Sequence, residues 1–223
     1  ADIMRATHLD EAIFASLCRE SDMYHVLQRC AILVSRMALT MPPPMFHDMV
    51  RATASWPDLC RRLISTSATL SHARSRKLVA LGLAHMLRHA SAQDKGLLSA
   101  VPDMIGMWTE VVGEVVEDEA GGADRYQREL SPTRALEIGE DGIPFLDEFG
   151  LIEAAPTPSS ARTDAVRSRD PSFTVPLRAY VADTLNAVLQ NGSYKTQLQS
   201  LLATIDPLVL DTLQRGLSER PVA

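Results

Sequence analysis

Two histidines stand at a spacing that could hold a metal. His85 and His89 lie four residues apart, which places two side chains on one face of a helix. Zinc proteases combine this spacing with a glutamate directly after the first histidine, but Met86 occupies that position here, and no third ligand is near. We therefore expect no metal site, and we expect these histidines to be exposed to solvent or to lie between helices.

The other residues that could react do not form a catalytic set. Cys18, Cys30 and Cys60 are odd in number, far apart and surrounded by apolar residues, which predicts buried free thiols in a reducing compartment. No G-x-S-x-G, P-loop or G-x-G-x-x-G motif occurs, and Gly121-Gly122 is flanked by acidic residues that would repel phosphate. The sequence thus predicts a protein that is not an enzyme and needs no cofactor. An enzyme built on a helical bundle is the weakest alternative.

Clustered carboxylates are the strongest candidate for a function. Between residues 117 and 148, ten carboxylates and three arginines give a net charge of −7, whereas the whole chain carries −6. A local negative field captures basic partners through long-range attraction that salt weakens. The residues proposed to contact a partner are Glu117, Asp118, Glu119, Asp124, Glu137, Glu140, Asp141, Asp147 and Glu148.

Two other interpretations of this acidic stretch remain open. It could be a solvated loop whose charge only keeps the protein in solution. Alternatively, part of it could fold back as a short amphipathic element that occupies a groove between helices. The apolar residues available for that element are Ile143, Phe145, Leu146, Phe149 and Leu151.

The basic residues form only small groups. Arg61-Arg62 is one, and Arg74, Arg76 and Lys77 are the other. With a net charge of −6 and no broad basic stripe, nucleic acid is not expected as the main partner. We expect these side chains to be solvated at a helix start or paired with carboxylates of an adjacent helix.

The two tryptophans have different surroundings. Trp108 falls within an apolar stripe and is predicted to be buried. Trp56 precedes Pro57 in an expected turn, so we expect it to be more open. Because tryptophan is enriched at binding hot spots, Trp56 is a candidate partner contact.

Helices must position all these residues. The hydrophobic share is 46% but aromatics are only 5%, and the Leu, Ala, Val and Met that dominate favour helix. Arg29 and Arg36 interrupt the most apolar region, so no membrane span is expected. The first twenty residues lack a secretory signal, and a helical pattern that is already running near Ala1 indicates a fragment of a longer protein.

Apolar residues recur at helical spacing along most of the chain. Between about residues 119 and 172 the pattern fades, which indicates a long insertion. Eight or nine helices and no convincing strand predict an all-α fold. Periodicity alone fits a helical bundle and a solenoid about equally well. The expected helices cover approximately residues 9–18, 23–41, 45–54, 59–70, 73–89, 98–115, 177–188, 198–205 and 207–217.

Several passages resemble a known family. They are YHVLQRCAILVSRMALTMPPPMF at 24–46, RKLVALGLAHML at 76–87 and VPDMIGMWTEVVGEVVEDE at 101–119, with DPSFTVPLRAY at 170–180 and IDP at 205–207 closing the series. In this order they are similar to the C-terminal repeats of importin-β (karyopherin-β) nuclear transport receptors, specifically the importin-eleven-like branch. Specificity comes from their order along the chain, because none is a catalytic motif.

The resemblance implies a fold and a function. The fold is an α-solenoid of antiparallel HEAT-type helix pairs, with residues 1–223 forming one C-terminal segment that carries the acidic insertion. Such receptors carry cargo proteins, which are commonly basic, shuttle between cytoplasm and nucleus, and bind the GTPase Ran chiefly through N-terminal repeats. Nuclear pore proteins are further expected partners, and membranes are not. The alternative is a general HEAT-repeat scaffold or adaptor.

Overall fold

The structure is a computed structural model that describes residues 9–18, 24–91, 93–94, 96–117, 124–126, 169–191 and 194–218. Nearly all of the described residues lie in helices, as the apolar periodicity predicts. The helices are α2 (Leu9–Cys18), α3 (Tyr24–Thr40), α4 (Pro43–Thr53), α5 (Trp56–Ser67), α6 (Ala73–Arg88), the 3-10 turn η1 (Leu98–Ala100), α7 (Val101–Glu114), α9 (Pro171–Thr174), α10 (Leu177–Gln190), α11 (Lys195–Leu202) and α12 (Pro207–Ser218).

Prolines and polar caps set the helix boundaries. The expected stop at Pro42 is confirmed, because α3 ends at Thr40, and Pro43 then opens α4. A proline suits a first helical turn, where its missing N–H has no partner to lose. Asp206 caps α12, since its Oδ1 accepts a hydrogen bond from the backbone N of Leu208 at 2.8 Å. Local sequence signals therefore fix where these helices begin and end.

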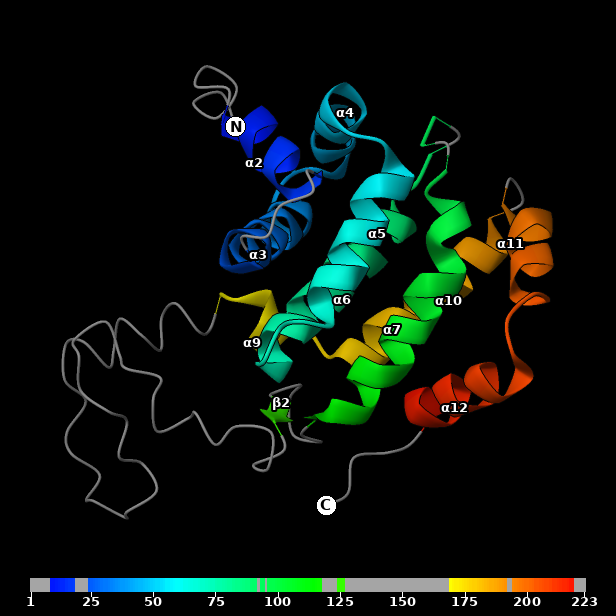
Figure 1. The fold of residues 1–223 in the computed structure, drawn as a ribbon. Coiled ribbons are helices and arrows are strands. Elements are labelled where there is room, and N and C mark those ends of the chain that lie inside the picture. The colour runs from blue at the N-terminus through cyan, green and yellow to red at the C-terminus, as the bar shows by residue number, and fades with distance from the viewer. Residues whose placement is uncertain are drawn as a thin grey trace, which may run out of the picture.

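The helices form two layers. Helices α2, α5, α7 and α12 follow one another in one layer, while α3, α6 and α10 lie side by side in the other (Figure 1). Successive helices joined by short turns, such as α2 with α3 and α5 with α6, pack across the layers. The all-α solenoid of helix pairs predicted from the sequence is confirmed.

Helix α6 lies at the centre of the molecule. It packs against α3 and α10 within its own layer and against α5 and α7 in the other. Its buried apolar residues cover more than one side, as expected for a helix between neighbours. Trp108 of α7 is fully buried against it, and its Nε1 donates a hydrogen bond to the carbonyl oxygen of Ala80 at 3.1 Å. The predicted burial of Trp108 is confirmed.

A short hairpin departs from the expected helical pattern. The helix predicted through Val115 ends at Glu114, and strand β1 (Val115–Glu117) follows it and pairs antiparallel with β2 (Asp124–Tyr126). Two consecutive valines are β-branched and favour extended backbone over helix. The rest of the predicted insertion, 118–123 and 127–168, lies outside the described residues. Among the described helices, none has both the length and the apolar composition needed to cross a bilayer.

Candidate functional site

Most of the candidate carboxylates lie outside the residues that the structure describes. Backbone positions are described for Glu117 and Asp124, which are direct partners in the register of the β1–β2 hairpin. The carboxylates outside the described residues are Asp118, Glu119, Glu137, Glu140, Asp141, Asp147 and Glu148.

An arginine at the start of α6 holds the point where the chain leaves α7. Arg76 forms ion pairs with Glu110, at 3.0 Å between Nη2 and Oε2, and with Glu114. Burial raises the pKa of Glu114, an effect that Arg76 opposes. The expectation that this basic group pairs with carboxylates of an adjacent helix is confirmed for Arg76.

Two further arginines hold the chain where it returns. The carboxylate of Asp170 accepts a hydrogen bond from Arg36 of α3 at 2.7 Å and caps α9 by accepting one from the backbone N of Ser172 at 2.9 Å. Burial alone would raise the pKa of Asp170, but these hydrogen bonds outweigh it and hold the pKa below its ordinary value. The guanidinium of Arg74 lies 4.5 Å from the centre of the Phe173 ring. Both ends of the predicted insertion are therefore attached near the first turns of α6.

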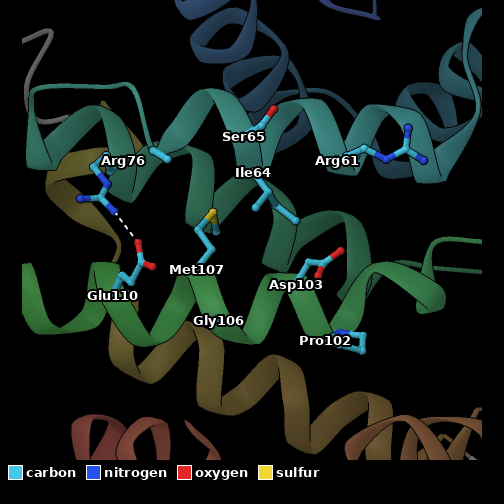
Figure 2. Close-up of a pocket in the computed structure, with 10 residues that line it drawn as sticks. Arg61, Ile64, Ser65, Arg76, Pro102, Asp103, Gly106, Met107 and Glu110 are labelled. Carbon is cyan, nitrogen blue, oxygen red and sulfur yellow. Dashed lines mark hydrogen bonds and ion pairs between the residues drawn. The ribbon is translucent and has the colours of Figure 1, made fainter. Parts of the chain in front are cut away.

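A groove lies between α5 and α7, which are neighbouring helices of one layer (Figure 2). Its volume is about 450 Å³. Ile64 and Met107 point into it from opposite sides and make its floor apolar (Figure 2). The complete lining is Arg61, Ile64, Ser65 and Ala68 from α5, Arg76 from α6, and Pro102, Asp103, Gly106, Met107 and Glu110 from α7.

Charged residues line the rim of this groove. Arg61 pairs with Asp58 on its own helix, with 3.0 Å between Nη1 and Oδ1, and Arg76 pairs with Glu110. Asp103 is exposed, and no ion pair with another described residue involves it. No motif in the sequence predicts this groove, and the one signal that points to it is Gly106, a glycine in the middle of an apolar helix.

Trp56 is buried, so the prediction of an open side chain is wrong. Only 3% of it is exposed, and its Nε1 donates a hydrogen bond to Asp94 Oδ1 at 3.1 Å. Ser55 caps α5, so Trp56 is the first helical residue rather than part of a free turn. Its ring packs inward on that of His47, with 4.9 Å between centres. In this structure Trp56 offers no surface to a partner.

Asp94, which no sequence pattern singles out, is the shared hydrogen-bond partner of the polar groups around Trp56. Its carboxylate pairs with His47 Nδ1 at 2.9 Å and accepts hydrogen bonds from Arg51 Nε at 2.9 Å and the Ser91 backbone N at 2.7 Å. Burial would raise the pKa of Asp94, but these hydrogen bonds outweigh it and hold the pKa well below its ordinary value. The node joins α4, α5 and the segment after α6.

The two histidines occupy the two expected environments, since His85 lies between α6 and α10 and His89 is exposed at the C-terminal end of α6. Tyr180 of α10 and His85 are hydrogen-bonded, with 2.5 Å between the Tyr180 hydroxyl and His85 Nδ1, and the His85 and His89 rings are 4.5 Å apart. Burial, with a smaller contribution from His89, lowers the pKa of His85 to about 4. Within the described parts of the chain, no three His, Cys, Asp or Glu side chains come together as metal ligands.

The cysteines are free thiols, but only one is fully buried. Cys60 lies in the core, and burial raises its pKa to about 12. Cys18 and Cys30 are half-buried, and burial raises the pKa of each. The prediction of buried thiols is therefore right for Cys60 and too strong for the other two. A raised pKa lowers the thiolate fraction and with it the reactivity of a thiol.

Two stacked helical layers with an open groove define a helical-repeat protein. The model of the family described as "Importin-11-like, TPR repeats" matches residues 1–218, and the chain belongs to this family. The description specifies TPR repeats, whereas the sequence resemblance predicted HEAT-type pairs; both are stacked two-helix units. The importin-like repeat family consists of transport receptors that are not enzymes. No curated protein and no solved structure matches the chain.

Proposed function

We propose that this chain is a cargo-binding segment of a nuclear transport receptor that imports basic proteins and shuttles between cytoplasm and nucleus. Membership of the importin-11-like family, over residues 1–218, is the observation that carries the proposal. In this view residues 1–223 are one receptor segment with an acidic insertion at about 119–172. It performs no catalysis, and neither nucleic acid nor a membrane is its main partner. Ran, acting chiefly through other repeats, and nuclear pore proteins are the further partners of the receptor.

The acidic stretch supports a basic cargo. Residues 117–148 carry a net charge of −7, which leaves the rest of the chain close to neutral. A field concentrated in one place raises the association rate of an oppositely charged partner by about 10-fold to 1,000-fold at low salt. The arginine contacts of Glu114 and Asp170 attach the chain to the solenoid close to the two ends of the predicted insertion, about 119–172, which contains this stretch. We therefore expect the carboxylates to attract a basic cargo to this receptor segment.

Neutralising part of the insertion tests this proposal. In one variant Glu137→Gln, Glu140→Gln and Asp141→Asn are combined. The matched control combines Asp48→Asn, Asp183→Asn and Asp211→Asn, which removes the same charge from exposed positions on α4, α10 and α12. The probe is a labelled peptide rich in lysine and arginine, and stopped-flow fluorescence measures its association rate across a salt series.

The insertion variant should slow association at low salt several-fold more than the control, and the difference should disappear at high salt. Equal rates for the two variants would show that only net charge matters and would contradict the proposal. Nuclear uptake of a fluorescent protein fused to the same peptide, in permeabilised cells given the receptor that contains this chain, extends the test. We expect reduced uptake with the insertion variant and unchanged uptake with the control.

A further inference from the structure

Three helical glycines have different surroundings. A Cβ added at Gly82 would lie 2.9 Å from Ser35 Cβ, and one added at Gly216 would lie 2.9 Å from Val112 Cγ1. These two glycines allow α6 to approach α3 and α12 to approach α7. A Cβ at Gly106 would meet no atom of another element within 4 Å. Packing within the described chain therefore accounts for the first two glycines and not for Gly106.

The lack of a packing neighbour at Gly106 is informative because of the position of this glycine in the helix. It lies near the middle of α7, where glycine costs about 1 kcal/mol of helix stability relative to alanine. Gly113 also has open space above it, but it lies next to the last residue of α7, directly before the strand. Helix ends tolerate glycine, so Gly113 needs no further explanation. Gly106 keeps a strip of bare backbone open inside the groove.

The groove extends along about two turns of α7. Its volume of about 450 Å³ falls within the usual range for binding sites, roughly 300–1,000 Å³. From Pro102 to Glu110 it follows α7 for about 12 Å at 1.5 Å per residue, a little over two turns. Partly exposed Ile64 supplies most of the apolar surface on which an aliphatic side chain can be buried, and Met107, which is only 5% exposed, forms the base of the groove beside it.

One stripe of α7 gives the groove its charge. Asp103, Gly106 and Glu110 follow one another at helical spacing and all line the groove. Asp103 has no ion pair with another described residue, and Glu110, whose side chain is 66% exposed, shares Arg76 with Glu114. Arg61 is already paired with Asp58. The α7 side therefore presents surplus negative charge on both sides of the bare glycine.

We propose that this groove binds a basic amphipathic helix of the cargo, an inference that rests on the proposed function and deepens it. The partner helix lies along α7 and places an aliphatic side chain on the backbone of Gly106, between Ile64 and Met107. Lysine or arginine residues about one turn to either side of that anchor meet Asp103 and Glu110. A helix is the fitting form because the acid–glycine–acid stripe repeats at helical spacing.

A bulky residue placed in the groove tests the inference. Gly106→Leu places a side chain in the groove, starting from a Cβ that meets no other element within 4 Å, and Gly113→Leu is the matched control, because it adds the same side chain to the same helix outside the groove. The probe is a labelled peptide with leucines on one helical face and lysines beside them. A peptide of the same composition in scrambled order controls for charge. Fluorescence anisotropy measures Kd, and circular dichroism confirms that each variant is folded.

We expect Gly106→Leu to raise the Kd of the amphipathic peptide at least tenfold and Gly113→Leu to leave it within twofold. Asp103→Asn should weaken binding several-fold at low salt and reduce its salt dependence. Equal Kd values for the two leucine variants would overturn the inference, as would equal affinity of the scrambled peptide for the unchanged protein. A photoreactive peptide should also crosslink to Met107 or Ile64 in the unchanged protein and not in Gly106→Leu.

The same peptide separates this inference from the proposed function. If neutralising Glu137, Glu140 and Asp141 slows capture while Gly106→Leu changes nothing, the receptor proposal stands and the groove inference falls. If Gly106→Leu weakens binding while the insertion variant equals its matched control, the groove is supported and the insertion has no part in capture. Should neither variant differ from its control, both proposals fail.

Discussion

Two neighbouring contacts in this solenoid use glycine in opposite ways. Between α3 and α6, Gly82 lies against Ser35 so closely that no methyl group fits. Between α5 and α7, Gly106 lies in a groove with open space above it. Gly82 allows two helices of one layer to pack closely, whereas Gly106 leaves a groove between two helices of the other layer. The comparison teaches that a helix-destabilising residue has to be interpreted through what packs on it, because its type alone does not separate structure from binding.

Buried and exposed carboxylates repeat this contrast. Asp94 is enclosed by groups from α4, α5 and the segment after α6, whereas Asp103 stands at the groove with no ion pair to another described residue. An enclosed charge depends on every partner, and removing the charge leaves the partners unsatisfied. An exposed charge is solvated by water and is available to another molecule. We expect the largest difference in stability between variants of Asp94 and Asp103.

Asp94→Ala should lower the free energy of unfolding by about 3–5 kcal/mol, because it leaves Arg51, His47 and the indole N–H of Trp56 without their shared acceptor. Asp103→Ala is the matched control and should change stability by less than about 0.5 kcal/mol. Urea denaturation followed by circular dichroism measures both. Similar losses for the two variants would remove the distinction between enclosed and exposed carboxylates.

Replacing Gly82 and Gly106 by alanine should give a smaller difference in the free energy of unfolding. Gly82→Ala should cost about 1–3 kcal/mol, because its Cβ would lie 2.9 Å from Ser35 Cβ and 3.0 Å from Ser35 Cα, which is backbone. Gly106→Ala should be neutral or stabilising by up to about 1 kcal/mol, since alanine is the better helix former and meets nothing. Urea midpoints of the two variants give the comparison. A destabilised Gly106→Ala would mean that α7 uses this glycine internally.

The ion pairs of Arg76 should give the smallest difference. Glu110→Gln should cost no more than about 0.5 kcal/mol, because its side chain is 66% exposed and water screens the pair. Glu114→Gln should cost more, since that side chain is only 23% exposed and contacts the same guanidinium. Thermal unfolding at low and high salt measures both effects. An equal cost for the two variants would indicate that burial does not distinguish these pairs.

The helices were predictable because their signals are local. Pro42 ends α3, Asp206 caps α12, and the apolar spacing of α7 predicts the burial of Trp108. Predictions from the sequence fail where a residue far along the chain determines the environment of a side chain. Trp56 precedes a proline and was expected to be open, but Asp94, 38 residues away, accepts its indole hydrogen bond. No local pattern reveals an acceptor that another segment supplies.

The candidate site was less predictable than the helices for the same reason. The groove is lined by residues of α5, α6 and α7, and their placement side by side depends on how whole helices pack. Arg76 was expected to pair with an adjacent helix, yet its actual partners, Glu110 and Glu114, follow only from the stacking of α6 on α7. The acidic insertion is predictable from composition alone, because the net charge of a segment follows from its residue types and does not depend on how the segment folds.

The attachment of the insertion near one helix end has a consequence for its evolution. Arg76 holds the departing chain and Arg74 the returning chain, so the distance between the two attachment points does not depend on how many residues lie between them. Doubling the length of a loop costs only about 0.6 kcal/mol of closure entropy. Lineages can therefore lengthen, shorten or exchange this segment while the helical stack stays unchanged, and an engineer could splice a foreign domain into the same place.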